Sequence, residues 1–293
     1  MRWIQDSKGS APRFRRKQAW LAENAAVADP DLATQLAESR YDAPGFAATY
    51  DRYRPRPPEV LLDMLPRLAG VERPRLVVDL GSGTGLSTRV WAERAEEAVG
   101  IEPNDAMRAE AESATQTENV RYLGGSSYET GLADECADVV TCSQSLQWME
   151  PEPTFTEVAR ILRSGGVFCA YEYRNLVTGR WAPEEAFEAT MAAASRIGDE
   201  RGLAKHSRRF PPSGERFESS GVFRRVRELS LHSVEQGDGE RLVGLALALG
   251  TVRRPLDEGV SEEELGLDRL RQVASKLPEG PWVWEYRAWL GLR

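Results

Sequence analysis

The segment Leu76-Val77-Val78-Asp79-Leu80-Gly81-Ser82-Gly83-Thr84-Gly85 decides the fold. Its first half is a short, continuous apolar run, which is typical of a β-strand that is buried on both faces. Its second half places a glycine at every second position, where the backbone can turn tightly and a ligand can approach without meeting a Cβ atom. A strand that leads through such a loop into a helix predicts a ligand site at the carboxyl edge of an open α/β sheet.

Strands and helices alternate on the C-terminal side of this segment. Further strands are expected at 98–101, 120–123, 137–142, 167–171, 223–232 and 282–289, and helices at 85–96, from Asn104 onward, and at 153–162, 239–249 and 261–276. Strands separated by helices of this length predict a mostly parallel sheet with helices on both faces.

The alternation divides the chain into four expected regions. Residues 1–55 predict a helical N-terminal cap, 56–173 a ligand-binding core, 174–215 a helical lid, and 216–293 strands and helices that complete the core. The boundary after Tyr173 is placed there because the strand–helix rhythm stops and an apolar helical face begins.

Charge and composition exclude one class of function. The 293 residues carry a formal net charge of −8, whereas proteins dedicated to nucleic acids usually have a basic excess. Since 41% of the residues are hydrophobic, the chain can bury a large core. We therefore expect a globular protein that binds a small molecule and no nucleic acid.

Cysteines and apolar runs exclude further classes. Three cysteines without a CxxC pair predict neither a disulfide framework nor a metal site. The first six residues lead into charge rather than into an apolar leader, and the longest apolar run, 242–249, is too short to span a membrane. The expectation is a cytoplasmic protein without a membrane span.

The spacing of the glycines separates the nucleotide-binding classes. A dinucleotide fingerprint reads G-x-G-x-x-G, but Leu86 stands in the place of its third glycine, and no Lys-Ser or Lys-Thr pair follows to make a P-loop. Glu102 ends the next expected strand, where a carboxylate can accept hydrogen bonds from both hydroxyls of a ribose. Glu102 therefore indicates a nucleoside but does not decide which one.

Six segments, in this order, resemble the motifs of class I S-adenosylmethionine-dependent methyltransferases. They are residues 50–55 (YDRYRP), 79–85 (DLGSGTG), 100–103 (GIEP), 131–140, 143–148 and 160–166. The first of these is similar to the "Y-D-x-x-R-P" segment of the trans-aconitate and ubiquinone/menaquinone methyltransferase-like branch. The resemblance implies a Rossmann-like, doubly wound, seven-stranded sheet with an antiparallel last strand, and S-adenosyl-L-methionine as the cofactor.

The resemblance also implies where the cofactor lies. The glycine loop of Gly81, Ser82, Gly83 and Gly85 would line its methionine part, with Asp79 at the amino group. Glu102 would bind the ribose. The other implied contacts are Pro103, Met107, Ser126 and Ser127 at the adenine, the Ser143 backbone near the sulfonium, and Tyr50 and Arg54 at the methionine carboxylate. Ser126 replaces the family's usual acid, and Tyr50 and Arg54 could equally serve simple packing at a helix start.

The methyl acceptor is expected beside the fourth and fifth strands and under the lid. The expected contacts are Gln147, Trp148, Tyr171, Tyr173 and Trp181. Gln147 stands where some relatives carry a histidine, and glutamine cannot take a proton. His206 is the candidate general base, with a solvated surface histidine as the alternative, whereas His232 is expected to be structural. The run Lys205, Arg208 and Arg209 either contacts an anionic acceptor or forms a solvated face.

Together these features predict a methyltransferase that acts by in-line displacement on a carboxylate, hydroxyl or carbon of a small molecule. Two alternatives stay open: an NAD-linked oxidoreductase, which shares the glycine loop and the acid, and a non-catalytic protein that binds S-adenosylmethionine or a nucleotide. The protein is expected to be a monomer or a homodimer.

Overall fold

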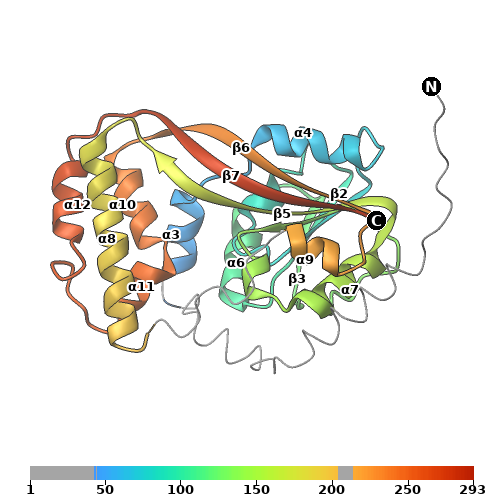
Figure 1. Cartoon of the computed structure of the whole chain (residues 1–293), viewed down its shortest axis with the longest axis horizontal. Coiled ribbons are helices and arrows are strands. Elements are labelled where there is room, and N and C mark those ends of the chain that lie inside the picture. Colours follow the sequence, from blue (N-terminus) through green and yellow to red (C-terminus); the bar gives the residue numbers. More distant parts are fainter. Residues whose placement is uncertain (1–42, 44, 204–213) are drawn as a thin grey trace.

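The structure is a computed structural model that describes residue 43 and residues 45–203 and 214–293. Figure 1 shows an α/β core beside a bundle of helices, with three long strands, β5, β6 and β7, running from one to the other. Most of the expected cap at 1–55 and the end of the expected lid at 174–215 lie outside the described residues.

The sheet has seven strands in the order β3-β2-β1-β4-β5-β7-β6. Their bounds are β1 Leu76–Leu80, β2 Glu97–Ile101, β3 Val120–Leu123, β4 Ala137–Ser143, β5 Leu162–Val177, β6 Arg225–Gly237 and β7 Gly280–Leu292. Only β7 runs against its neighbours. The expected Rossmann-like, mostly parallel sheet with an antiparallel last strand is confirmed.

Short helices cover the core. They are α4 Glu59–Leu68, α5 Leu86–Arg89, α6 Asp105–Ala114, the 3-10 helix η1 Leu146–Trp148, α7 Pro151–Ile161 and α9 Gly214–Ser219. Asn104 caps α6, as expected, because its side-chain oxygen accepts a hydrogen bond from the Met107 backbone N–H. The helix expected over 85–96 is α-helical only over α5 and continues as turns.

A helical body stands at the far ends of the long strands. It consists of α3 Phe46–Tyr53, α8 Trp181–Glu200, α10 Gly239–Leu247, α11 Gly250–Asp257 and α12 Leu267–Ala274. Helix α8 packs against α11 and α12, and α10 packs against α3 and α12. The sequence grouped 216–293 with the core, whereas in the structure the segment between β6 and β7 belongs to this body. The reason is strand length, since β6 and β7 carry the chain past the edge of the core before it turns into helices.

Strand β5 begins earlier and ends later than expected. We expected the Ser164-Gly165-Gly166 stretch to end the preceding helix, but in the structure it lies inside the strand. Gly165 has a φ of 80°, and a Cβ on Gly166 would come 3.0 Å from the Arg163 carbonyl oxygen. These glycines therefore allow a tight start to β5 directly after α7.

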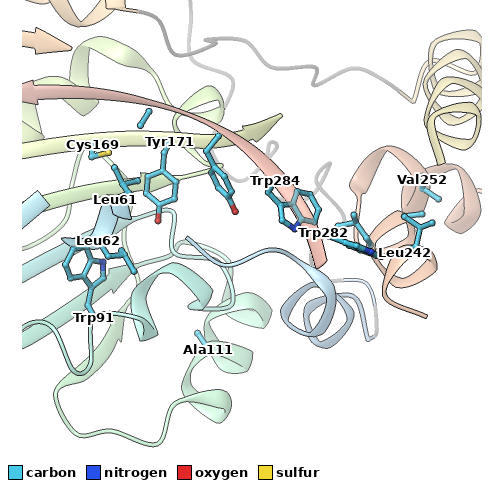
Figure 2. Close-up of a cluster of buried hydrophobic side chains, with 14 of the residues drawn as sticks. Leu61, Leu62, Trp91, Ala111, Cys169, Tyr171, Leu242, Val252, Trp282 and Trp284 are labelled. Atoms are coloured by element: carbon cyan, nitrogen blue, oxygen red, sulfur yellow. The ribbon is translucent and has the colours of Figure 1, made fainter. Parts of the chain in front are cut away.

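One hydrophobic cluster runs through both the core and the helical body. Figure 2 shows Leu61, Leu62 and Trp91 close to Cys169 and Tyr171, and Trp282 beside Leu242 in the helical body. Trp282 and Trp284 are almost fully buried on β7. The long strands thus place the helical body through a continuous apolar core rather than through a flexible linker.

Candidate functional site

The glycine loop lies between β1 and α5, at the carboxyl edge of the sheet. All three alternating glycines have a positive φ, of 67° at Gly81, 56° at Gly83 and 81° at Gly85. A Cβ on Gly81 would lie 2.6 Å from the Ser145 Cβ, and one on Gly85 would lie 2.2 Å from the Tyr122 hydroxyl oxygen. Neighbouring protein atoms therefore require glycine at these two positions, whether or not their backbone also contacts a ligand as expected.

Gly83 is the exception. The nearest atom to a Cβ built there is the terminal methyl of Met107, at 3.5 Å. The backbone at Gly83 therefore faces space that the described residues do not fill, with Met107 of α6 on one side. This is the opening that a ligand would use.

Asp79 is buried inside the protein below this opening. Its carboxylate has no exposed surface and accepts hydrogen bonds from the hydroxyls of Ser87, Thr88 and Thr141, at 2.6 to 2.8 Å. Burial raises the pKa of Asp79, and the three hydroxyl donors oppose that rise. Asp79 thus joins β1, α5 and β4, and its expected contact with an amino group stays a prediction.

Glu102 lies at the carboxyl end of β2, next to the glycine loop. One of its carboxylate oxygens accepts the Gly83 N–H at 2.8 Å and the other accepts the Asn104 N–H at 2.9 Å. Burial raises the pKa of Glu102 above 4.5, while these backbone donors and Arg108 lower it. Each oxygen keeps a further lone pair, so the carboxylate can still accept a hydroxyl donor.

Several polar side chains near the loop are buried without a partner among the described residues. They are the Ser82 hydroxyl, the Thr84 hydroxyl and the Ser126 hydroxyl. Buried polar atoms are nearly always hydrogen-bonded, so these three hydroxyl groups indicate that a polar ligand or water binds here. Ser127 differs, because its hydroxyl is hydrogen-bonded to that of Thr154 at 2.7 Å.

Helix α3 is tied to the glycine loop by one arginine. Arg89 of α5 donates to the Asp51 carboxylate at 2.6 Å and to the Thr84 carbonyl oxygen at 2.5 Å. The next turn brings Arg54 over the ring of Tyr50, with the guanidinium carbon 4.4 Å from the ring centroid, and 5.4 Å from that of Tyr173. The structure thus brings Tyr50 and Arg54 to the same side of the molecule as the expected acceptor residue Tyr173.

The turn after β4 contains a residue that sequence reasoning missed. Gln144 has a φ of 57°, which is unusual for a non-glycine residue, and its side-chain nitrogen is buried without a partner among the described residues. Its backbone is held from both sides, since its N–H donates to the Tyr171 carbonyl oxygen and its own carbonyl oxygen accepts from Gln147. No sequence signal identifies such a conformation, because glutamine has no preference for it.

The expected acceptor residues are placed unequally. Tyr171 is buried on β5, and its burial beside the charge of Asp79 raises the pKa of its phenol well above 10. Tyr173 contacts the rings of Trp284 and Tyr286, and its hydroxyl is buried and unpaired within the described part of the chain. Trp148 is 41% exposed, and Gln147 is used within its own turn.

Trp181, another of the expected acceptor contacts, is not buried. It is the first residue of α8 and is 80% exposed, whereas Phe187, Met191 and Ile197 on the same helix pack against the core. His206, Lys205, Arg208 and Arg209 lie outside the described residues. His232 is an exposed residue of β6.

Comparison with known proteins identifies the central part of the chain. Residues 78–170, from β1 to β5, match the methyltransferase domain family. Over this segment, which is less than half of the chain, the protein is similar to methyltransferases. S-adenosylmethionine is the methyl donor of such domains, and the described loop fits it, because Gly83 is open, Glu102 stands beside it and three hydroxyls lack partners.

Curated relatives match part of the chain. An uncharacterized methyltransferase of Mycobacterium tuberculosis is 37% identical over 118 residues, covering 40% of this chain and 46% of the relative. A probable S-adenosylmethionine-dependent methyltransferase of Saccharomyces cerevisiae is 30% identical, covering 43% of this chain and 45% of the relative. The match thus spans about half the length of these relatives.

A solved structure extends the likeness in fold. A candidate type II methyltransferase from Anaeromyxobacter dehalogenans superposes with a TM-score of 0.60 and 20% identity, covering 82% of this chain and 98% of the other. The shared fold therefore includes more than the matched domain. Within the described residues, no helix is both long enough and apolar enough to cross a membrane.

Proposed function

We propose that this protein transfers the methyl group of S-adenosylmethionine to a small-molecule acceptor. The observation that carries the proposal is the opening at Gly83, where the missing Cβ leaves room and the Glu102 carboxylate stands 2.8 Å from the backbone nitrogen. Backbone exposed in this way next to an acid suits a nucleoside with two ribose hydroxyls.

Different residues would contact different parts of the cofactor. Glu102 accepts the ribose hydroxyls, Pro103 and Met107 flank the adenine with Ser126, and the loop of residues 81–85 lines the methionine part. Arg54 suits the methionine carboxylate because a guanidinium binds that group with two hydrogen bonds. The cofactor itself supplies an electrophilic methyl group on a positively charged sulfur.

Positioning is the task left to the protein. In-line displacement needs the acceptor atom, methyl carbon and sulfur in one line, and holding that geometry lowers the barrier. The turn at Ser143 and Gln144 is fixed by hydrogen bonds to β5 and to Gln147, so it can hold an acceptor rigidly. No general base is assigned among the described residues.

Two unpaired groups favour an acceptor that carries oxygen. The Gln144 amide nitrogen and the Tyr173 hydroxyl are buried, and both can donate a hydrogen bond. A carboxylate or hydroxyl oxygen of a metabolite would satisfy them. Tyr173→Phe should therefore raise the KM for the acceptor while the Kd for S-adenosylmethionine stays unchanged.

The NAD-linked alternative has less support. A dinucleotide diphosphate binds at the N-terminus of a regular helix, whereas α5 is only four residues long. Leu86, in the place of the third fingerprint glycine, also argues against it. Transfer of the methyl group to an acceptor would exclude the alternative of a non-catalytic binding protein.

Calorimetry and labelling test the proposal together. The parent protein should bind S-adenosylmethionine and not NAD, and Glu102→Ala and Gly83→Val, if still folded, should bind it much more weakly. Transfer of a labelled methyl group to any compound from a panel of carboxylic acids and phenols would demonstrate catalysis. Tight binding of NAD, or equal binding by the two variants, would refute the cofactor assignment.

A further inference from the structure

Strand β6 forms one edge of the sheet. It is 13 residues long and pairs with β7 along its whole length without a shift in register. No other strand of the described chain pairs with its outer side. It contains no proline and no lysine, and its charged residues, Arg225, Arg227, Glu228 and Glu235, lie toward its two ends and leave residues 229–234 without a formal charge when His232 is neutral.

The outward backbone groups of β6 belong to its even-numbered residues. In an antiparallel pair, alternate residues direct both their N–H and their C=O to opposite neighbours. The Arg293 N–H, directly after β7, donates to Gly166 of β5, so Leu292 and its partner Arg225 face each other, and the odd-numbered residues of β6 bond to β7. In agreement, the Val226 and Gln236 carbonyl oxygens accept hydrogen bonds from arginine side chains. By alternation, Glu228, Ser230, His232 and Val234 therefore also direct their backbone groups to the open edge.

The sequence of β6 is complementary to its own reverse. Reading outward from Ser230, the counterparts are Leu229 with Leu231, Glu228 with His232, Arg227 with Ser233, Val226 with Val234, and Arg225 with Glu235. Within one copy Glu228 also pairs with Arg287 and Glu235 with Arg241, so these acids would be shared with the partner's residues. Apolar residues thus face apolar ones and an acid faces a hydrogen-bond donor or a cation. Such cross-strand pairs stabilise antiparallel strands.

We propose that two copies of this protein pair antiparallel through β6, with the twofold axis at Ser230. The pairs Ser230–Ser230, Glu228–His232 and Val226–Val234 then join residues whose backbone groups face outward, as hydrogen bonding requires. The twofold axis repeats the last two pairs, which makes five hydrogen-bonded pairs in all. Each pair exchanges two bonds, so this register forms about ten bonds between the copies. That number is typical of a specific interface.

Neighbouring registers are less favourable. Moving the axis to Leu231 places Glu228 opposite Val234 and Val226 opposite Gln236. Moving it to Leu229 places Val226 opposite His232 and Arg227 opposite Leu231. Both shifts oppose polar and apolar side chains, so the pattern specifies one register.

Apolar burial adds to the backbone pairing. Leu229 and Leu231 are only partly buried where they pack against the main core, and Val234 is 63% exposed. Pairing through Ser230 places Leu229 of each copy against Leu231 of the other and covers Val234 with Val226. The cores of the two copies thereby meet along one face of a continuous sheet.

Sedimentation of the full chain tests the pairing. The parent should have twice the mass of the 32.6 kDa chain at micromolar concentration. Ser230→Pro removes an outward N–H without removing a bond to β7 and should produce the monomer, whereas the matched Ser230→Thr should stay dimeric. Circular dichroism and S-adenosylmethionine binding check that the proline variant is folded.

Cross-linking tests the register independently of the proline variant. Hydrogen-bonded antiparallel residues lie about 5.5 Å apart between Cα atoms, within the range of a disulfide. Ser230→Cys should therefore form a disulfide with its own copy under mild oxidation. Ser233→Cys alone should not, but it should cross-link to Arg227→Cys when the two proteins are mixed.

Different outcomes test the pairing through β6 and its register. A monomeric parent, or a dimer that persists in Ser230→Pro, would overturn the pairing through β6. A dimer in which Ser233→Cys links to itself and Ser230→Cys does not would overturn the twofold axis at Ser230. The expected combination is a dimer that dissociates with proline and links at Ser230.

Discussion

At the residue scale, identical glycines in one loop have different reasons to be glycine. Gly85 lies against the Tyr122 hydroxyl and Gly81 against Ser145, whereas Gly83 faces open space. A stability measurement and a binding measurement should therefore separate them, although the sequence shows them as one repeat.

Gly85→Ala should destabilise the protein by about 3 kcal/mol or more, because the new Cβ overlaps the Tyr122 hydroxyl and the positive φ itself costs about 1 kcal/mol. Gly83→Ala should cost only about 1 kcal/mol but weaken S-adenosylmethionine binding at least about tenfold. Urea unfolding and calorimetry measure the two effects. Equal loss of stability in both variants would contradict the assignment.

Glu102 should make cofactor binding depend on pH. Burial raises its pKa above 4.5, and only the ionised carboxylate accepts from both ribose hydroxyls. Affinity should therefore fall as the pH is lowered, beginning above the usual range of a glutamate. Glu102→Gln should lower affinity about tenfold to a hundredfold at pH 7, since hydrogen bonds to a charged group are worth about 1.5–3 kcal/mol, and should remove the fall.

The stability of Glu102→Gln distinguishes binding from folding. A buried acid with a raised pKa favours the folded state at low pH, so its ionised form contributes no stability at pH 7. Because the glutamine amide has one acceptor oxygen in place of two, either the Gly83 or the Asn104 N–H loses its partner, and the unfolding free energy should fall by only about 1–3 kcal/mol. A collapse of stability would assign Glu102 to folding alone.

At the element scale, α3 is held against the glycine loop by Arg89. Arg89→Met breaks the contacts to Asp51 and to the Thr84 carbonyl, where both charged side chains are 19% exposed. Leaving Asp51 without a partner should cost about 1–3 kcal/mol and speed amide exchange in α3. Arg52→Met is the control, because its pair with Glu240 is exposed and should change stability by less than about 1 kcal/mol.

Elements whose pattern is local could be predicted from the sequence. The strand at 76–80, the Asn104 cap and the strand at 120–123 agree with the structure because apolar runs and caps act within a few residues. The lengths of β5, β6 and β7 could not, since residues that extend a strand do so by pairing with distant partners. The same reason explains why α10, α11 and α12 pack with α8.

At the scale of the whole molecule, acid stability should depend on the contact between α7 and the loop at Thr130. Burial alone would raise the pKa of Glu157, but hydrogen bonds from Arg160 and Thr130 outweigh it and lower the pKa to about 2. A depressed folded pKa contributes stability above about pH 4.5 that is lost as the pH falls toward 2.

Glu157→Gln should therefore be less stable than the parent at pH 7 and should lose less stability on acidification. Urea unfolding at pH 7, 4.5 and 3 measures the difference. The two proteins should approach each other at the lowest pH. If the unfolding free energies of the two proteins changed with pH in parallel across the whole range, the pKa of Glu157 would be the same in the folded and unfolded states, and the prediction would be wrong.

Features of the candidate site that require a particular residue type could be predicted from the sequence. Features that arise from the backbone conformation could not. The glycine loop and Glu102 could be found, because few residues can serve a close approach or accept from a ribose. Gln144 could not be, since its positive φ follows from contacts with Tyr171 and Gln147. The hydrogen bonds of Asp79 and Ser127 to protein hydroxyls could not be predicted either, because their partners are distant in sequence or lie in other elements.

The pairing of Gly237 with Gly280 has a consequence for how such proteins diversify. The chain leaves the sheet and returns to it at adjacent points, so the segment between them can change in length while β6 and β7 keep their register. Helices α10 and α12 are less free to change, because their buried side chains belong to the same apolar cluster as Trp282. Insertions should therefore be tolerated best at exposed turns between these helices, such as residues 257–259.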